Sequence, residues 1–365
     1  MSKSKIGTTE AVLLVLTIII AHSILSLPRD MIVRTQSATI INIIYITLAC
    51  TLISLLICKL FKKFGNTDII DISEYLGGKF FKAIVGSIFI FYFIASSSIL
   101  LRNFCEALGL VYFQMTPIIF IILLFVIGSC ISNRLGFNAS LKVNLIIIPI
   151  ALISILFIFF ANFKNFDIQK IFPILGSGFG NTFLTGLLNL SAFEGILYLF
   201  FLPPHLKEPK KYKKISIIST ILTGLYLVLC VSIILFIFPS FFTTNEIMPL
   251  YSAARYISFG NFLQRLESIF MFVWIVAFTS YLTIASKFAV IIFQKLTNIK
   301  NTKEIINVFG LLILAISMLP KNLAISTFLE TKIYSYFSIA IIFIMGIIIL
   351  ILANLKKKNL REVKK

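Results

Sequence analysis

The stretch NLSAFEGILYLFFLPP (Asn189–Pro204) is an apolar run that contains one carboxylate, Glu194, and ends in two prolines. An ionised carboxylate that faces lipid near the bilayer centre costs several kcal/mol. Glu194 is therefore expected to be protonated, to be paired, or to face a wet cavity. Two roles fit this residue. It binds a ligand amine or couples a proton, or it is a structural acid bonded to neighbouring helices.

The two prolines and the glycine in this stretch predict where its helix changes. Proline has no backbone N–H and cannot continue a helix, so we expect the helix to end at Pro203 and Pro204. Gly195, directly after the acid, indicates close packing or local unwinding. The stretch is therefore expected to form a broken membrane helix.

The composition of the whole chain indicates an integral membrane protein. Hydrophobic residues make up 59% of the 365 residues and charged residues 13%, whereas soluble domains carry about 25% charged residues. The apolar residues occur in blocks of roughly 18 to 25, which is long enough to span a bilayer as a helix. We predict one all-α transmembrane domain, 1–365, with ten transmembrane helices over 9–33, 38–60, 81–110, 115–134, 141–162, 180–204, 212–238, 265–294, 304–320 and 332–354.

The loop charges predict the orientation of these spans. The net charge is +19, with 33 Lys and Arg against 14 Asp and Glu, and most basic residues lie in alternate loops and at both ends, including the tail 355–365. The positive-inside rule then places both termini in the cytoplasm, and an even number of spans likewise requires both termini to lie on the same side. The lysine clusters are interpreted as topology determinants and contacts to anionic membrane lipid, and no nucleic-acid partner is expected.

Two longer polar segments, 61–82 and 205–214, contain no nucleotide-binding or catalytic motif. The first is expected to form a short amphipathic helix on the inner leaflet. The five cysteines lie in or beside apolar blocks and form no CxxC pair. We therefore expect no enzyme activity, no catalytic residue, no cofactor and no metal.

A second interrupted segment, VLTIIIAHSILSLPRDM (residues 15–31), lies in the first span. The tetrapeptide His22-Ser-Ile-Leu in this segment resembles Glu194-Gly-Ile-Leu. His22 lies about 13 residues, or roughly 20 Å, into its span from the inner face of the membrane, and Glu194 lies equally far into its span from the outer face. Interrupted helices at corresponding places in two halves predict an inverted-repeat transporter with its site at the breaks. The repeats are expected over about 9–162 and 180–354.

The predicted ligand site combines both breaks with polar residues from the middle of other spans. His22 either binds a ligand or only bonds to a neighbouring helix, and the mid-span hydroxyls either line a cavity or join helices. Arg102 and Glu106 are spaced to pair on one helix face. The candidate site residues are Ala21, His22, Ser23, Ile24, Ser96, Ser97, Phe193, Glu194, Gly195, Ser280 and Tyr281.

Four stretches resemble the B-subunit family of spore-germination receptors, the endospore germination permeases. HSILSLP (22–28) resembles the first helix of that family, and FEGILYLFFLP (193–203) resembles its sixth. The third and eighth helices are matched by LLRNFCEALG (100–109), followed by TP at 116–117, and by QRLESIFMFVWIVAF (264–278). The family usually has a glycine near the position of His22. The larger histidine side chain is a departure from that pattern that affects which class of ligand fits and how large the cavity is.

This resemblance implies the amino acid–polyamine–organocation superfamily, with a five-plus-five inverted repeat (LeuT-like) and broken helices 1 and 6. It implies a central small-molecule site between helices one, three, six and eight. It also implies the spore inner membrane, a germinant receptor A subunit, a lipoprotein C subunit and an amino-acid germinant. Three functions stay open: a ligand-sensing receptor subunit, an active amino-acid permease, and a channel component.

Overall fold

The computed structural model describes residues 5–239, 243, 245–257, 266–299 and 301–362, with side chains as far as residue 357. Within these residues the only extended pairing is a single bridge between Ile6 and Leu206. The helices of the first half are α1 (Thr8–Ser23), α2 (Leu27–Thr35), α3 (Thr39–Phe61), α4 (Ile69–Val111), α5 (Ile118–Leu135) and α6 (Phe137–Ala161), with short 3-10 helices at Gln36–Ala38, Phe163–Asn165 and Ile168–Ile171.

The second half is also helical. It contains α7 (Phe179–Phe183), a 3-10 helix Thr185–Phe200, short 3-10 turns at Pro203–His205 and Pro209–Lys211, α8 (Tyr212–Ile237), α10 (Pro249–Arg255), α11 (Leu266–Thr297) and α12 (Thr302–Ser317). A last stretch joins α13 (Leu323–Phe328), a π-helix Leu329–Tyr334, α14 (Ser335–Ile339), a second π-helix Ala340–Met345 and α15 (Gly346–Glu362).

The prediction of a helical membrane protein is confirmed. Eight helical stretches of the described residues are long and apolar enough to cross a membrane. α1, with 16 residues, is a shorter apolar helix. Each of the ten predicted spans overlaps a helical part of the described chain, and residue 265, the first of the eighth span, lies outside the described residues. The ten-span count and the inverted repeat stay predictions.

The polar segment before the third predicted span forms a helix of its own. Asp68 caps it by accepting hydrogen bonds from the backbone of Ile70 and Asp71, both at 3.1 Å. The helix is interrupted at Gly77 and Gly78, whose φ of 72° is easily reached only by glycine. A helix is thus present within 61–82, as the first part of α4, and its position on the inner leaflet stays a prediction.

The break in the first span lies between α1 and α2. Residues 21–23 remain helical, and residues 24–26 form a turn in which the Leu25 amide donates to the His22 carbonyl at 3.1 Å. Pro28 follows in the first turn of α2, where a missing N–H costs least. The sequence predicts loss of helical geometry over residues 21–25. Because the turn lies at 24–26, this prediction is confirmed for residues 24 and 25 and is wrong for residues 21–23.

The second break lies beside the acid in the opening stretch. Phe193 has non-helical backbone angles (φ −96°, ψ 27°) inside the 3-10 helix Thr185–Phe200. At Gly195 a Cβ atom would lie 2.3 Å from the Val15 carbonyl oxygen of α1. Glycine therefore allows the two interrupted segments to touch, and the interpretation of Gly195 as a close-packing residue is confirmed.

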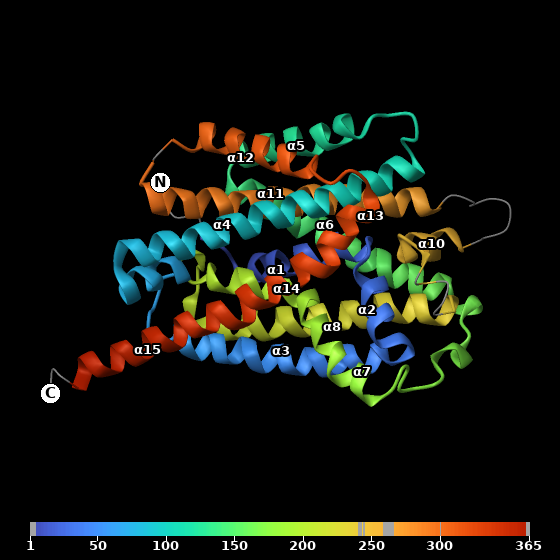
Figure 1. Cartoon of the computed structure of the whole chain (residues 1–365), viewed down its shortest axis with the longest axis horizontal. Helices are drawn as coiled ribbons and strands as arrows, with labels where there is room; N and C mark the ends of the chain where they lie inside the picture. Colours follow the sequence, from blue (N-terminus) through green and yellow to red (C-terminus); the bar gives the residue numbers. More distant parts are fainter. Residues whose placement is uncertain (1–4, 240–242, 244, 258–265, 300, 363–365) are drawn as a thin grey trace.

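α1 lies at the centre of the bundle, with α4 and α11 on one side and α3 and α8 on the other (Figure 1). It packs against α6, α8, α11 and the 3-10 helix Thr185–Phe200, and every residue from Ala11 to Ser23 is buried.

Several segments that were predicted on one side of the membrane contact each other. The Ile6 amide donates to the His205 carbonyl at 2.6 Å, and Lys356 Nζ donates to the Tyr75 carbonyl at 2.9 Å.

Candidate functional site

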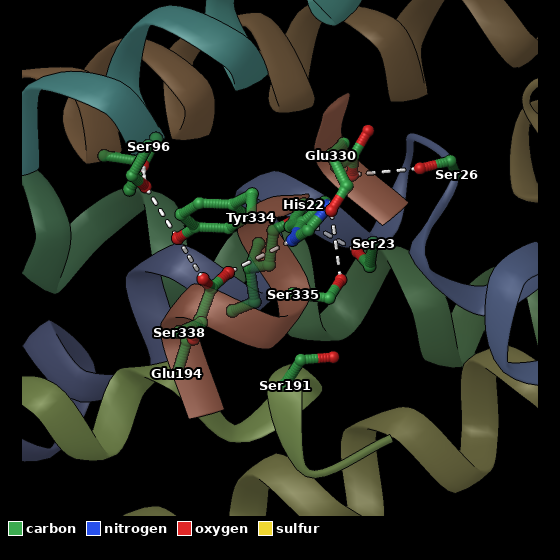
Figure 2. A network of polar contacts seen from close by, with 12 residues as sticks. His22, Ser23, Ser26, Ser96, Ser191, Glu194, Glu330, Tyr334, Ser335 and Ser338 are labelled. Carbon is green, nitrogen blue, oxygen red and sulfur yellow. Dashed lines mark hydrogen bonds and ion pairs between the residues drawn. The ribbon is translucent and has the colours of Figure 1, made fainter. Parts of the chain in front are cut away.

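His22, at the end of α1, lies between two buried carboxylates from distant parts of the chain (Figure 2). Its Nδ1 atom is 3.1 Å from Glu194 Oε1, and its Nε2 atom hydrogen-bonds Glu330 Oε1. The exposed fractions are 4% for His22, 1% for Glu194 and 2% for Glu330. The site therefore joins both helix breaks to the π-helix Leu329–Tyr334 without contact to bulk water.

The other hydrogen-bond partners of the two carboxylates are donors. Glu194 Oε2 accepts from the Tyr92 hydroxyl at 3.2 Å and from the Tyr334 hydroxyl. Glu330 accepts from the Ser26 hydroxyl at 2.9 Å and from the Asn103 side-chain amide. Buried carboxylates are tolerated when donors surround them in this way, since an unpaired buried charge costs several kcal/mol.

The geometry around His22 determines how many protons the site holds. A neutral imidazole has one N–H donor and one acceptor nitrogen. Here both ring nitrogens meet carboxylate oxygens, so a proton is needed at each contact. For both contacts to be hydrogen bonds, the three side chains must share two protons, which is one more than a neutral histidine with two carboxylates holds. Because the other hydrogen-bond partners of the two carboxylates donate, an imidazolium between the carboxylates satisfies all of these contacts.

A chain of hydroxyl groups extends from Glu194 to α11. The Tyr334 hydroxyl lies 2.8 Å from Ser96 Oγ, and Ser96 in turn bonds the Tyr281 hydroxyl. The Tyr92 and Tyr334 rings stack with their centroids 5.5 Å apart. The π-helix Leu329–Tyr334 places Glu330 and Tyr334 toward the same network, and short π segments occur frequently at functional sites.

Neighbouring side chains replace hydrogen bonds that the first break removes. The Ile20 carbonyl, near the end of α1, accepts from Ser23 Oγ at 2.9 Å and from Trp274 Nε1 at 3.2 Å. Ser23 also bonds the Tyr226 hydroxyl of α8. Terminal carbonyls of a helix need such partners in a dry interior. Ser23 and Trp274 therefore hold the end of α1 in place next to His22.

The structure brings four of the predicted site residues into one connected network: His22, Ser96, Glu194 and Tyr281. Ala21 and Ile24 are buried beside the first break, Phe193 and Gly195 lie at the second, and Ser97 is buried next to Ser96. Their part in ligand binding stays a prediction.

Ser23 and Ser280 make polar contacts outside that network. Ser23 bonds Tyr226, as described above. Ser280 bonds Asn144 on α6, and Asn144 Nδ2 donates to Thr17 Oγ1 at 2.7 Å. This second set of contacts joins α11, α6 and α1. Ser280 therefore joins α11 to α6, and the part of Ser23 and Ser280 in ligand binding stays a prediction.

Sequence reasoning missed Glu330, Tyr334, Tyr92, Asn103 and Ser26. The last span was expected to begin at residue 332, which left Glu330 outside the membrane. The sequence feature that could have identified Glu330 is its spacing from Tyr334 and Ser338. These three residues lie four positions apart and share a helix face. Tyr92, Ser96 and Asn103 show similar spacing along α4.

The predicted pair on α4 is confirmed. Arg102 contacts Glu106 one turn later, with Nε 3.0 Å and Nη2 2.8 Å from Glu106 Oε1. Arg102 Nη1 also approaches the Ser317 carbonyl at the end of α12 at 3.4 Å. This pair therefore lies between α4 and α12 and is separate from the His22 site.

Comparison with known proteins agrees with the resemblance noted in the sequence. The sequence model of a family described as "Spore germination protein" matches residues 5–326. The chain is 24% identical to spore germination protein YndE of Bacillus subtilis (strain 168) over 362 residues, 98% of each chain. It is 25% identical to spore germination protein A2 of the same organism over 68% of this chain and 69% of that protein.

A third relative comes from another species. Spore germination protein XB of Bacillus anthracis is 21% identical over 75% of this chain and 77% of its own. The matched range contains both helix breaks with His22 and Glu194, whereas Glu330 lies just beyond it. Since the family match covers most of the 365 residues, the chain belongs to the spore germination protein family.

Proposed function

We propose that this protein is the membrane-embedded B subunit of a germinant receptor, which binds an amino-acid germinant at the His22 site and signals together with an A subunit and a lipoprotein C subunit. Family membership and the germination proteins among its relatives support this function. The proposal includes a single transmembrane domain of ten helices in a five-plus-five inverted repeat. It also includes the spore inner membrane and cytoplasmic termini, as the lysine-rich loops favour.

The proposed class of ligand is inferred from the contacts of His22 with Glu194 and Glu330 at the helix breaks. The His22 imidazolium lies against Glu194 at the second break. The Glu330 carboxylate lies against Ser26, the residue that precedes the N-terminus of α2 at the first break. An amino-acid zwitterion carries the same two charges. Its ammonium group suits Glu194, and its carboxylate suits the positive end of the α2 dipole.

Binding is therefore proposed to proceed by exchange of partners. A ligand ammonium group replaces His22 at Glu194, and a ligand carboxylate replaces Glu330 near Ser26. Because a ligand shifts an equilibrium only through different affinities for two states, this exchange must favour a second arrangement of the breaks. Glu330 lies in the π-helix Leu329–Tyr334, which continues along the chain into α14 and α15. The carboxyl-terminal helix is thus the element that transmits the change to a partner subunit.

The test is the germinant dose–response of spores that carry Glu194→Gln. Glutamine keeps the size and hydrogen bonding of the side chain but cannot hold the ligand ammonium as an anion. Loss of a charge-assisted hydrogen bond of roughly 1.5–3 kcal/mol shifts the half-maximal germinant concentration upward by roughly tenfold to a hundredfold. Glu304→Gln, on the exposed start of α12, is the matched control. An unshifted Glu194→Gln curve at normal protein abundance contradicts the proposal.

A second candidate function, a proton-coupled amino-acid permease, is favoured by the extra proton in the His22 site. A ligand that displaces His22 from Glu194 changes the hydrogen bonds that retain this proton, so binding and proton release are linked. Uptake into liposomes separates the two functions. A permease accumulates the amino acid when a proton gradient is imposed, whereas a sensor binds it without uptake.

A further inference from the structure

A cavity of about 760 Å³ opens at the lysine-rich end of the bundle, away from the His22 site. The end of α3, the segment after Pro203 and the beginning of α8 enclose it. Its floor contains side chains that are largely buried, among them Phe61, Leu206 and Tyr212. A cavity of this volume is within the range that binds small organic ligands.

Four exposed lysines surround this floor: Lys59 and Lys62 on the α3 side, and Lys210 and Lys213 on the α8 side. No aspartate or glutamate lines the cavity. In the part of the chain that the structure describes, none of the four has an ion-pair partner. The acid in the adjoining loop, Glu208, is instead paired with Lys211 at 2.8 Å. Four like charges thus remain uncompensated around one apolar surface.

The outer surface next to the cavity is apolar. Leu48 and Leu52, on the turns of α3 before Lys59, are 63% and 68% exposed. On α8, Ile221 and Leu225 are also exposed, and α3 packs directly against α8. This surface suits hydrocarbon chains. The lysines lie where the apolar surface ends, which is the depth of phospholipid headgroups.

We propose that this cavity binds one anionic phospholipid, with its phosphate at the four lysines, its glycerol over the apolar floor and its acyl chains along α3 and α8. Basic pockets between transmembrane helices are a recognised form of acidic-lipid site. The apolar floor argues for a lipid over free phosphate, which would leave that surface uncovered. Four charges also suit a headgroup with two phosphates better than one with a single phosphate.

The position of the site gives the lipid a structural role. Leu206 lines the cavity and pairs with Ile6, and the Lys207 amide donates to the Ile6 carbonyl at 2.9 Å. The segment that contains Leu206 follows the broken helix of Glu194 directly. A headgroup that joins Lys62 to Lys213 therefore holds the beginning of α8, which follows the Leu206 segment, against α3 and reduces the repulsion between lysines of the two sides.

The test compares two double variants of the full-length protein that lose the same charge. Lys62→Gln with Lys213→Gln removes one lysine from each side of the cavity. Lys63→Gln with Lys214→Gln removes their sequence neighbours, which are exposed and do not line it. Bound lipid is counted by native mass spectrometry, and the thermal unfolding midpoint is followed as phosphatidylglycerol or cardiolipin is added to protein in a zwitterionic detergent.

We expect anionic lipid to raise the unfolding midpoint of the wild-type protein and of the control variant. Lipid affinity of the cavity variant should fall about 25-fold, because each of the two lysines near an anionic headgroup contributes about a fivefold gain. Equal weakening of both variants would mean diffuse surface attraction and would overturn the proposal. Equal stabilisation by phosphatidylcholine, or by inorganic phosphate alone, would overturn it as well. None of these outcomes depends on the germinant.

Discussion

His22 and Glu194 are 172 positions apart in the chain, and their side chains meet with 3.1 Å between Nδ1 and Oε1. Each belongs to one of the two interrupted segments, and the contact joins the segments near the centre of the bundle (Figure 2). Glu330 binds the other side of the same imidazole ring. One histidine thus connects the amino-terminal break, the second break and the carboxyl-terminal helices, and several consequences of this arrangement are measurable.

Glu330→Gln should have the opposite effect on germinant response to Glu194→Gln. If Glu330 occupies the place of the ligand carboxylate, its neutralisation removes an internal competitor and leaves His22 and Glu194 as a balanced pair. We expect the half-maximal germinant concentration to fall by about tenfold, equivalent to about 1.4 kcal/mol. Spore germination curves at matched protein levels measure this. A rightward shift for both variants contradicts a competitor role for Glu330.

His22→Ala should destabilise the fold. Its removal leaves two buried carboxylates without their shared cation, and loss of one partner from a buried ion pair costs about 3–5 kcal/mol. We expect a lower thermal unfolding midpoint for the purified protein. Adding Glu330→Gln to His22→Ala should recover part of this loss, because one of the two unpaired charges is then absent. Strictly additive effects of the two changes would show that His22 and Glu330 are not coupled.

Gly195→Ala should also lower stability, by about 1–3 kcal/mol, through overpacking. The added Cβ would lie 2.3 Å from the Val15 carbonyl oxygen, and a backbone atom cannot move aside as a side chain does. Gly180→Ala is the matched control, since no atom lies within 4 Å of its added Cβ. The measurement is the unfolding midpoint of each variant in the same detergent. Equal midpoints would mean that the two broken segments do not touch at Gly195.

Both ends of the chain should be reached by thiol reagents from the same side of the membrane. Lys5→Cys and Lys356→Cys place exposed thiols near the two ends, and Met115→Cys places one in the loop before α5, where Met115 is 98% exposed. We expect an impermeant maleimide to label position 115, but not positions 5 or 356, in intact cells. Four of the five native cysteines are buried, so background labelling should be low. Labelling of position 5 or 356 from outside contradicts the cytoplasmic orientation.

The sequence alone determined the class of this protein, the helical segments and the approximate places of both breaks. These features depend on local chemistry. Apolar blocks of sufficient length must pair their backbone groups within helices, and a proline changes the hydrogen bonds of the residues around it. Polar residues in apolar blocks identified His22 and Glu194 as unusual, since burial of such groups requires a partner. The resemblance to spore-germination proteins rested on the same two segments.

The tertiary structure alone decided which partners these residues have. His22 meets Glu330 across 308 positions, and the Glu194 carboxylate accepts hydrogen bonds from two tyrosines on different helices. The sequence carries little information on such contacts because lipid-facing and protein-facing sides of these helices are both apolar. Without an amphipathic pattern, the face that each helix turns inward depends on how all the helices pack. The placement of His22 between two carboxylates is therefore a property of the packed bundle.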